Sequence, residues 1–255
     1  MQKLEPFFNP ASIAVIGASR TPGKIGYTIL ENLKKTFSGK LYPINLEATD
    51  IIGLKAYPSI LQVEEPVDLA VIVVKAEVVK TVLEECIKKK VKAAVIISSG
   101  FGEIGKKERE LELKNLSKKI RIIGPNCLGM FIPNVMDMLF LQREKLKRPL
   151  EGSISFITQS GAVGSAIMDL IGWEGAGISK FISYGNAVDV NEIELMDFLS
   201  KDMGTRAIAM YLESTKEGQA FMEAAKKVVK VKPLICLKAG KTQKGIEAVA
   251  SHTGA

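Results

Sequence analysis

The sequence predicts an α/β protein with two doubly wound, mainly parallel β-sheets, and three observations lead to this fold class. Short apolar runs rich in β-branched residues alternate with longer amphipathic stretches along all 255 residues, as in parallel strands joined by crossover helices. The runs are continuously apolar rather than alternating, which predicts helices on both faces of each sheet. Nine such runs are also too many for one sheet of ordinary size.

Five of the predicted strands precede residue 128, and four follow residue 150. They are Ser12–Ala18, Leu41–Asn45, Asp68–Val74, Ala93–Ser99, Arg121–Pro125, Ser153–Gln159, Ser179–Tyr184, Ala207–Glu213 and Leu234–Lys238. Apolar residues at three- and four-residue spacing predict amphipathic helices between them. These helices are Lys24–Thr36, Val78–Lys90, Lys106–Lys118, Ala162–Trp173, Glu192–Lys201 and Glu217–Lys230.

The stretch Leu128–Leu150 interrupts this rhythm. It contains Pro133, Pro149 and a charged cluster at Arg143–Arg148, and it has no clear helical period. The predicted division is therefore a first domain at residues 1–130, a linker at 131–150 and a second domain at 151–255. Doubly wound sheets bind ligands at the carboxyl ends of their strands, so the strand-to-helix turns are the places to look for chemistry.

The charge balance suits a phosphate-rich ligand better than nucleic acid. Thirty-five Lys and Arg against 28 Asp and Glu give a net charge of +7, a moderate excess that attracts polyphosphates or an acidic partner. The basic residues are scattered through mixed-sign stretches such as Lys106–Glu110, and few aromatic residues accompany them. No nucleic-acid partner is therefore expected.

The cysteine pattern and the amino terminus indicate a cytoplasmic protein. Cys86, Cys127 and Cys236 are odd in number, far apart and without metal-ligand spacing, so we expect neither a disulfide framework nor a metal site. The first residues lack the basic start and apolar stretch of a signal peptide. No apolar run approaches the roughly 18 residues that a membrane span requires, and no membrane association is expected.

The turn 17–26 follows the first predicted strand and leads into a predicted helix. Its glycines relax the backbone, and the amino terminus of the helix presents N–H groups to an anion. The glycine spacing is longer than G-x-G-x-x-G, and Pro22 is unusual in a dinucleotide fold, which disfavours NAD. A tight turn that needs glycine only to pack a helix on the sheet remains the alternative.

Two further strand ends in the first domain carry polar groups. After the second strand, where NAD enzymes need an acidic residue, Asn45 lies nearer the strand end than Glu47. After the fourth strand, Ser98 and Ser99 precede Gly100 and offer two hydroxyls to a phosphate or a pantetheine amide. A plain glycine-rich connection is an equal alternative for that turn.

The second domain begins with a similar turn at residues 158–164, which reads TQSGAVG. It lacks the upstream glycine of the G-x-S-x-G nucleophile elbow, so an esterase triad is not expected. We predict instead an anion site at the amino terminus of a helix. Its donors are Ser160 Oγ and the backbone N–H groups of Gly161 and Ala162.

His252 is the only histidine of the chain, and Ser251, Thr253 and Gly254 surround it. Small and hydroxylated neighbours leave room for a phosphoryl group on the ring, although most lone histidines have no special role. An imidazole that carries phosphate also needs a carboxylate on its second nitrogen. Glu213, at the end of a predicted strand, is the candidate.

Nearly the whole chain carries, in order, the motifs FFNPASIAVIGAS, LYPIN, SSGFGE, IGPNCLGMFIPN, SISFITQSGAVGSA, YLES and SHTGA. In this set and order the sequence resembles the NDP-forming acyl-CoA synthetases. That superfamily includes the α subunit of succinyl-CoA synthetase and, with closer similarity, the archaeal-type ADP-forming acetyl-CoA synthetases. The resemblance implies a Rossmann-like CoA-binding domain followed by a flavodoxin-like doubly wound domain that carries a phosphohistidine in SHTGA.

The resemblance also implies roles for individual residues. His252 and Glu213 correspond to the catalytic pair. The succinyl-CoA enzymes have a Lys at the position of Asn45, so the cationic contact to CoA phosphates is expected from Arg20 or Lys24. The implied CoA-binding residues are Gly17, Ser19, Arg20, Thr21, Pro22, Gly23, Lys24, Asn45, Ser98, Ser99 and Asn126.

The implied activity is that of an acid-thiol ligase of the acetate–CoA, ADP-forming type. It interconverts acyl-CoA, ADP and phosphate with acid, CoA and ATP. No segment here resembles an ATP-grasp domain, so the expected partner is an ATP-grasp β subunit that binds ADP or ATP with Mg²⁺. A non-catalytic CoA- or nucleotide-sensing module is the alternative. An NAD-dependent oxidoreductase is a third interpretation, which lacks both the fingerprint spacing and a catalytic acid–base pair.

Overall fold

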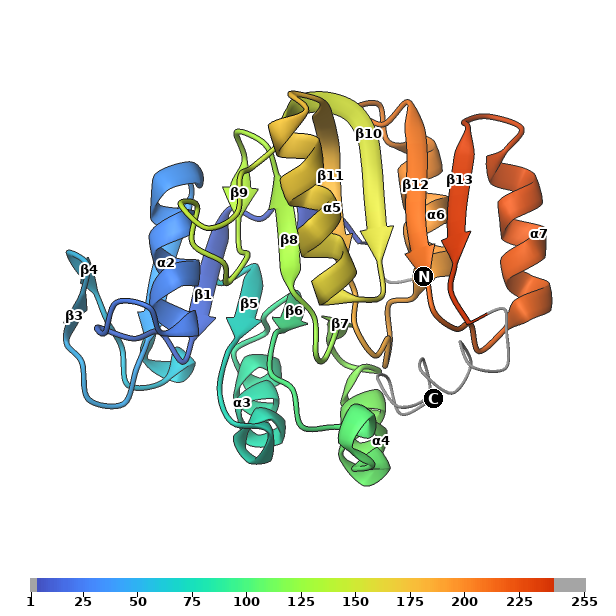
Figure 1. Cartoon of the computed structure of the whole chain (residues 1–255). Coiled ribbons are helices and arrows are strands. Elements are labelled where there is room, and N and C mark those ends of the chain that lie inside the picture. The colour runs from blue at the N-terminus through green and yellow to red at the C-terminus, as the bar shows by residue number, and fades with distance from the viewer. Residues whose placement is uncertain (1–3, 241–255) are drawn as a thin grey trace.

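The computed structural model describes residues 4–240, and two β-sheets lie side by side at its centre (Figure 1). The first sheet has the order β2-β1-β5-β6-β7, and every pair in it is parallel. Its strands are β1 (Ser12–Ile16), β2 (Lys40–Ile44), β5 (Leu69–Ile72), β6 (Ala93–Ile96) and β7 (Arg121–Ile123). The five strands predicted for the first half are confirmed.

Helices cover both faces of the first sheet, because alternate residues of each strand point to opposite sides. Ile13 and Val15 of β1 pack in one apolar cluster with α2, whereas Ala14 and Ile16 pack in another with α3 and α4. The helices are α2 (Ile25–Thr36), α3 (Ala76–Lys88) and α4 (Lys107–Leu116). This arrangement is the doubly wound one that the continuous apolar runs predict.

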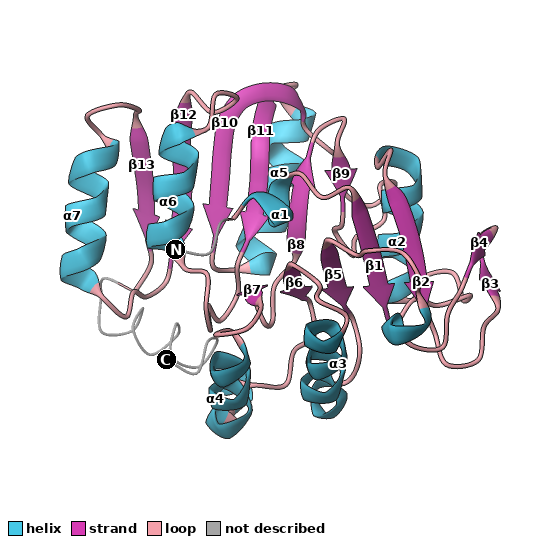
Figure 2. Ribbon diagram, turned by 180° about the vertical axis from the view of Figure 1, so that it is seen from behind, coloured by secondary structure: helices cyan, strands magenta, loops and turns pink. Residues whose placement is uncertain are grey.

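The second sheet has the order β13-β12-β10-β11-β8-β9. Its parallel strands are β10 (Leu150–Thr158), β11 (Gly177–Ser183), β12 (Ala207–Leu212) and β13 (Leu234–Lys238). Helix α5 (Gly161–Trp173) covers one face in Figure 1, while α6 (Glu192–Lys201) and α7 (Gly218–Val228) cover the other, seen in Figure 2. The four predicted strands and three predicted helices of this half are confirmed, and so is the α/β fold class.

Part of the stretch predicted to be a linker, residues 131–150, extends the second sheet. β8 (Gly129–Ile132) pairs antiparallel with β11, and β9 (Met136–Asp137) pairs antiparallel with β8. The linker prediction is wrong in this respect because two short antiparallel strands around Pro133 share neither the helical period nor the long apolar runs of their neighbours.

Short elements complete the described chain. They are α1 (Glu5–Phe8), the hairpin strands β3 (Asp50–Ile51) and β4 (Leu54–Lys55), and the 3-10 turns η1 (Ile60–Gln62) and η2 (Gly102–Ile104). Within residues 4–240, no helix combines the length and the apolar character needed to cross a bilayer.

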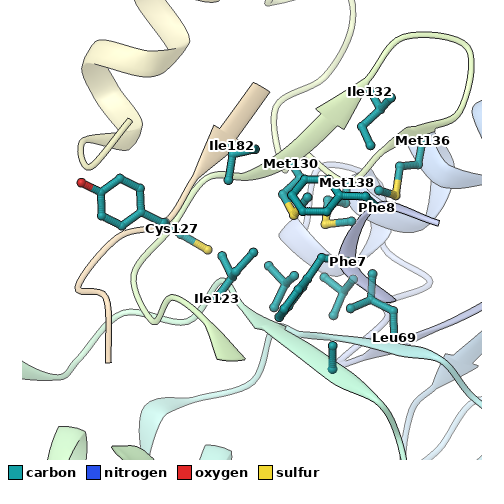
Figure 3. Packing of buried hydrophobic residues seen from close by; sticks show 14 of the residues in the cluster. Phe7, Phe8, Leu69, Ile123, Cys127, Met130, Ile132, Met136, Met138 and Ile182 are labelled. Carbon is teal, nitrogen blue, oxygen red and sulfur yellow. The ribbon is translucent and has the colours of Figure 1, made fainter. Parts of the chain in front are cut away.

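One hydrophobic cluster belongs to both sheets (Figure 3). Phe7 and Phe8 of α1 lie in it together with Met130 of β8 and Ile182 of β11. The ring of Phe8 stacks on that of Phe198 from α6, with centroids 4.2 Å apart. Because burial stabilises by about 25 cal/mol per Å² of apolar surface, this shared cluster holds the two sheets together as one body.

A buried ion-pair cluster fastens the stretch that follows β8. The side chain of Asp137 is fully buried and accepts hydrogen bonds from Arg148 Nε at 2.9 Å and from Arg143 Nε at 3.0 Å. The backbone N–H of Asp137 donates to Thr36 Oγ1 of α2 at 3.1 Å. Buried carboxylates persist only when they are paired, so the loop after β9 owes its conformation to this residue.

We expect Asp137→Asn to lower the free energy of unfolding by about 3 kcal/mol, since two guanidinium groups lose their buried counter-charge. Urea unfolding followed by circular dichroism measures the change. The control is Asp197→Asn, which breaks an exposed pair with Lys201 and should cost less than about 0.5 kcal/mol. Equal effects of the two substitutions would contradict the role assigned to the buried cluster.

Candidate functional site

A cavity of about 1020 Å³ lies where the two sheets meet. The parallel strands of both sheets end on the same side of the molecule (Figure 1), and the turns that follow β5, β6, β7, β10, β11 and β12 form the cavity walls. The site residues predicted from the sequence that line it are Ser98, Ser99, Asn126, Ser160, Gly161, Ala162 and Glu213. The fold thus brings together turns that are far apart in the sequence.

The amino terminus of α5 forms the wall contributed by the second sheet. Ser160 is its N-cap, and Ser160 Oγ accepts a hydrogen bond from the N–H of Val163 at 3.3 Å. The first-turn N–H groups, which include those of Gly161 and Ala162, have no acceptor within the helix and form the positive end of its dipole. A helix end of this kind, open to a cavity, has the geometry that binds an anion.

Glu213 follows β12 and is 5% exposed. The backbone N–H groups of Glu213 and Ser214 both donate to Gln159 Oε1, at 2.8 and 2.9 Å. Gln159 directly precedes the N-cap of α5, so one side-chain amide joins the turn of Glu213 to the turn at the helix end. His252, the predicted partner of Glu213, lies outside the described residues.

The turn after β6 and the turn after β7 form the opposite wall. Ser98 Oγ donates to the carbonyl of Val74 at 2.6 Å, whereas Ser99 is exposed. Asn126 has a left-handed backbone with φ of 58°, and its N–H donates to the carbonyl of Ser98 at 2.9 Å. Hydrogen bonds therefore join two of the three residues predicted for this part of the CoA site, Ser98 and Asn126, and Ser99 lies exposed next to them.

The turn 17–24 lies at the end of β1, beside the cavity rather than in its lining. Ile25, the first residue of α2, does line the cavity. The Ser19 hydroxyl accepts a hydrogen bond from the N–H of Thr21 at 3.0 Å, and residues 20–24 are exposed. The residues predicted to contact phosphate therefore lie on an exposed turn. The residue that follows this turn, Ile25, belongs to the cavity lining.

Glycine is required at two positions of this turn for different structural reasons. Gly17 has φ of 92°, and a Cβ there would lie 2.5 Å from the carbonyl oxygen of Val73, so close packing alone accounts for it. Gly23 has φ of 82° with open space around it. Only the backbone conformation calls for glycine at position 23, and the surface beside it is accessible to a ligand.

Asn45 supports this turn from the next strand end. Its Nδ2 donates to the carbonyl of Ala18 at 2.8 Å, while its Oδ1 accepts from the N–H groups of Glu47 and Ala48 at 2.9 and 2.8 Å. The amide therefore braces the backbone. The positive charge at this end of the first sheet comes from the exposed Arg20 and Lys24.

The polar side chains of the cavity that were not predicted from the sequence include Lys75, Lys107, Lys216, Glu103, Glu110 and Asn186. Lys75 follows the third strand of the first sheet, and Lys216 comes three residues after Glu213. Because both residues follow strands, their positions could have indicated a place in the site. The sequence does not mark the other four in this way. Glu103, Lys107 and Glu110 lie in a stretch that is charged on all sides, and Asn186 lies in an ordinary loop.

Burial keeps two acidic side chains near the cavity neutral. The thiol of Cys127 donates to the carbonyl of Ile96 at 3.3 Å, and burial raises its pKa to about 12. Burial also raises the pKa of Tyr184 well above its usual value, and the charges of Glu192 and Glu213 add to that rise. Cys127 is therefore a packing residue rather than a nucleophile. In the described part of the chain, no group of three or more metal-ligating side chains occurs.

Comparison with known proteins gives a class to this arrangement. A CoA binding domain model matches residues 11–133, and a succinyl-CoA ligase like flavodoxin domain model matches residues 151–255. The two matches correspond to the two sheets whose turns enclose the cavity. The molecule is therefore of the class that joins a CoA-binding domain to a flavodoxin-like ligase domain.

Several of the individual relatives are named as ADP-forming acetate–CoA ligases. The α subunit of ADP-forming acetate–CoA ligase II from Pyrococcus furiosus is 46% identical, over 98% of this chain and 55% of that subunit. The ADP-forming acetate–CoA ligase of Methanocaldococcus jannaschii is 47% identical, over 96% of this chain and 34% of that protein. The dinucleotide forming acetyl-coenzyme A synthetase 1 of Ca. Korarchaeum cryptofilum, solved with phosphate and ADP, has a TM-score of 0.93 and 43% identity, over 100% of this chain and 55% of that one.

The chain belongs to the NDP-forming acyl-CoA synthetase family, and the resemblance seen in its motifs is confirmed. It spans about half the length of the P. furiosus subunit and about a third of the M. jannaschii protein.

Iodoacetamide at about pH 8 should alkylate Cys236 in the folded chain and leave Cys86 and Cys127 unmodified. Burial raises the pKa of the latter two thiols to about 12, whereas Cys236 is exposed. Mass spectrometry of peptides reports each site, and all three cysteines should react in urea. Rapid labelling of Cys127 in the folded chain would show that its thiol is an accessible nucleophile.

Proposed function

We propose that this chain is the CoA-binding, phosphohistidine-carrying portion of an ADP-forming acyl-CoA synthetase of the acetyl-CoA type. The observation that carries the proposal is the single cavity in which Ser98, Ser99 and Asn126 face the end of α5 and Glu213. A thioester ligand and an inorganic anion need such adjacent sites if one is to react with the other.

In the proposed complex, CoA lies along the carboxyl end of the first sheet. Its phosphates rest on the exposed turn 17–24, where Arg20 and Lys24 supply positive charge, and its pantetheine arm enters the cavity past the Ser98–Ser99 turn. Lys75 and Lys107 add positive charge at the cavity wall. The volume of about 1020 Å³ is large enough for a ligand of this size.

Inorganic phosphate is proposed to bind at the end of α5, held by Ser160 Oγ and the N–H groups of Gly161 and Ala162. Its oxygen attacks the thioester carbonyl, the C–S bond breaks, and CoA leaves as the thiol with an acyl phosphate as co-product. The helix dipole stabilises the negative charge throughout, and phosphoryl chemistry depends mainly on such positioning and electrostatics.

His252 is proposed to take the phosphoryl group next. A ring nitrogen attacks phosphorus, the P–O bond to the acyl group breaks, and the acyl group leaves as a carboxylate. Glu213 accepts the hydrogen bond of the second ring nitrogen and so fixes the tautomer of the imidazole. The phosphohistidine then passes its phosphoryl group to ADP, which an ATP-grasp β subunit binds with Mg²⁺.

A partner subunit and a cytoplasmic location complete the proposal. The P. furiosus relative is named as an α subunit, which supports a partner for this chain as well. Cys86 and Cys127 are buried thiols, and structural cysteines kept as thiols suit a reducing compartment.

Calorimetry should show that the chain binds CoA and not NAD, with an affinity that falls as salt rises because phosphates carry much of the contact. Gly23→Val should weaken CoA binding about tenfold, since a β-branched residue resists the left-handed conformation of the phosphate turn. The matched control is Gly175→Val, which has φ of 70° and open surroundings but lies at the opposite end of α5. Binding of NAD without binding of CoA would refute the proposal.

With the ATP-grasp partner and radiolabelled ATP, the label should appear on this chain, disappear in acid, and be absent from His252→Ala. Glu213→Gln should slow labelling by about 100-fold, because the imidazole loses the charge that orients it. Glu217→Gln, an exposed neighbour on the same loop, is the control and should label normally. Acid-stable label, or label in His252→Ala, would move the phosphate to Ser160, Ser251 or Thr253.

A further inference from the structure

Asn186 lies where the cavity-facing loops of the two sheets meet. It follows β11 of the second sheet and lines the cavity. Its Nδ2 donates to Glu103 Oε2 at 2.7 Å and to Glu110 Oε1 at 2.5 Å, while its Oδ1 accepts from Asn126 Nδ2 at 3.2 Å. One side chain from the second sheet therefore satisfies three polar groups of the first.

The two carboxylates that Asn186 contacts hold the turn after Ser99. Glu103 Oε1 accepts the N–H of Gly100 at 2.5 Å and that of Phe101 at 3.2 Å. Glu110 Oε1 accepts the N–H of Gly102 at 3.2 Å. Burial acts to raise the pKa of Glu103, but these hydrogen bonds and that of Asn186 outweigh it and lower the pKa. Both carboxylates are therefore acceptors fixed between the turn and Asn186.

The backbone at Asn186 is also anchored to the first sheet. Its N–H donates to the carbonyl of Pro125 at 3.0 Å. The preceding Gly185 has φ of 58°, and a Cβ there would lie 2.2 Å from the same carbonyl oxygen. Only glycine allows the two loops to approach this closely, so the position of residue 186 next to Asn126 is built into the backbone.

We propose that Asn186 is a positioning residue that holds the Ser98–Gly102 turn and Asn126 in register with the end of α5. An uncharged amide supplies two donors and an acceptor in one plane, and no other side chain of this length does so. An ionised Asp cannot donate to two carboxylates, and an apolar residue removes the hydrogen bond that each of the three partners makes with residue 186. The expected effect of Asn186 on CoA affinity rests on the proposed function, whereas its expected effect on the conformation of the turn does not.

The first test needs no ligand. In the 255-residue chain, Asn186→Asp should raise the hydrogen-exchange rate of the Gly100, Phe101 and Gly102 amides at least about tenfold, since their acceptor carboxylates are repelled. Mass spectrometry of peptides from this region measures the exchange. Asn115→Asp, an exposed change on α4, is the matched control and should leave these rates unchanged. Wild-type exchange in Asn186→Asp would overturn the proposal, and Asn186→Ala gives the same test if the first variant fails to fold.

Reversal of donor and acceptor separates this role from a general loss of structure. In the double variant Asn186→Asp with Glu103→Gln, the new amide at position 103 donates to the new carboxylate and still accepts from Gly100 and Phe101. We expect slower exchange and tighter CoA binding than in Asn186→Asp alone, with full recovery prevented by Glu110. A double variant no better than the single one would overturn the hydrogen-bond assignment.

CoA affinity provides the functional measurement. Asn186→Asp should weaken CoA binding by calorimetry about tenfold, as expected when a charge-assisted hydrogen-bond network at a site is broken. Faster exchange with unchanged CoA affinity would overturn the link between Asn186 and the ligand. A wild-type chain that does not bind CoA would contradict the proposed function alone, because the exchange measurement still decides the role of Asn186 in the turn.

Discussion

The apolar junction between the two sheets is the contact on which the rest of the structure depends. It runs from α1 through β8 and β11 to α6, where Phe8 stacks on Phe198. Arg121 of the first sheet adds a buried polar contact, since its guanidinium pairs with Asp189 and Glu194 of the second. Protein interiors are packed as densely as organic crystals, so a junction of this kind fixes the angle between the sheets. The carboxyl ends of all parallel strands therefore keep constant relative positions.

Turns at those strand ends still need support, because they lack the hydrogen-bond ladders of the sheets. Three side-chain amides provide it in the same way. Asn45 braces the turn after β1, Gln159 braces the turn after β12, and Asn186 braces the turn after β6. An amide bridges backbone groups and carboxylates without bringing a charge of its own into a partly buried place. Turns in and beside the cavity walls are thus cross-linked by hydrogen bonds although they are loops.

The cavity has side chains of both charge signs and one helix end that suits an anion. Lys75, Lys107 and Lys216 line it together with Glu103, Glu110 and Glu213, and the positive end of the α5 dipole opens into it. Cys127 lines the same space as a buried neutral thiol, so its presence adds no competing nucleophile. Glu213 lies in the turn that Gln159 orients. Reactivity in such a site comes from placing reactants beside fixed dipoles rather than from an unusual protein group.

The sequence by itself determined the nine parallel strands, the helices between them and the turns that carry Ser98, Ser160 and Glu213. Apolar runs, three- and four-residue spacing and strand-end glycines are local properties, so they can be recognised along a single chain. Only the tertiary structure decided that residues 129–137 join the second sheet and that Asn186 meets Glu103 and Glu110, 83 and 76 positions away. Short antiparallel strands and long-range hydrogen bonds depend on which surfaces come together, and burial between the two sheets settles that only when the whole chain has folded.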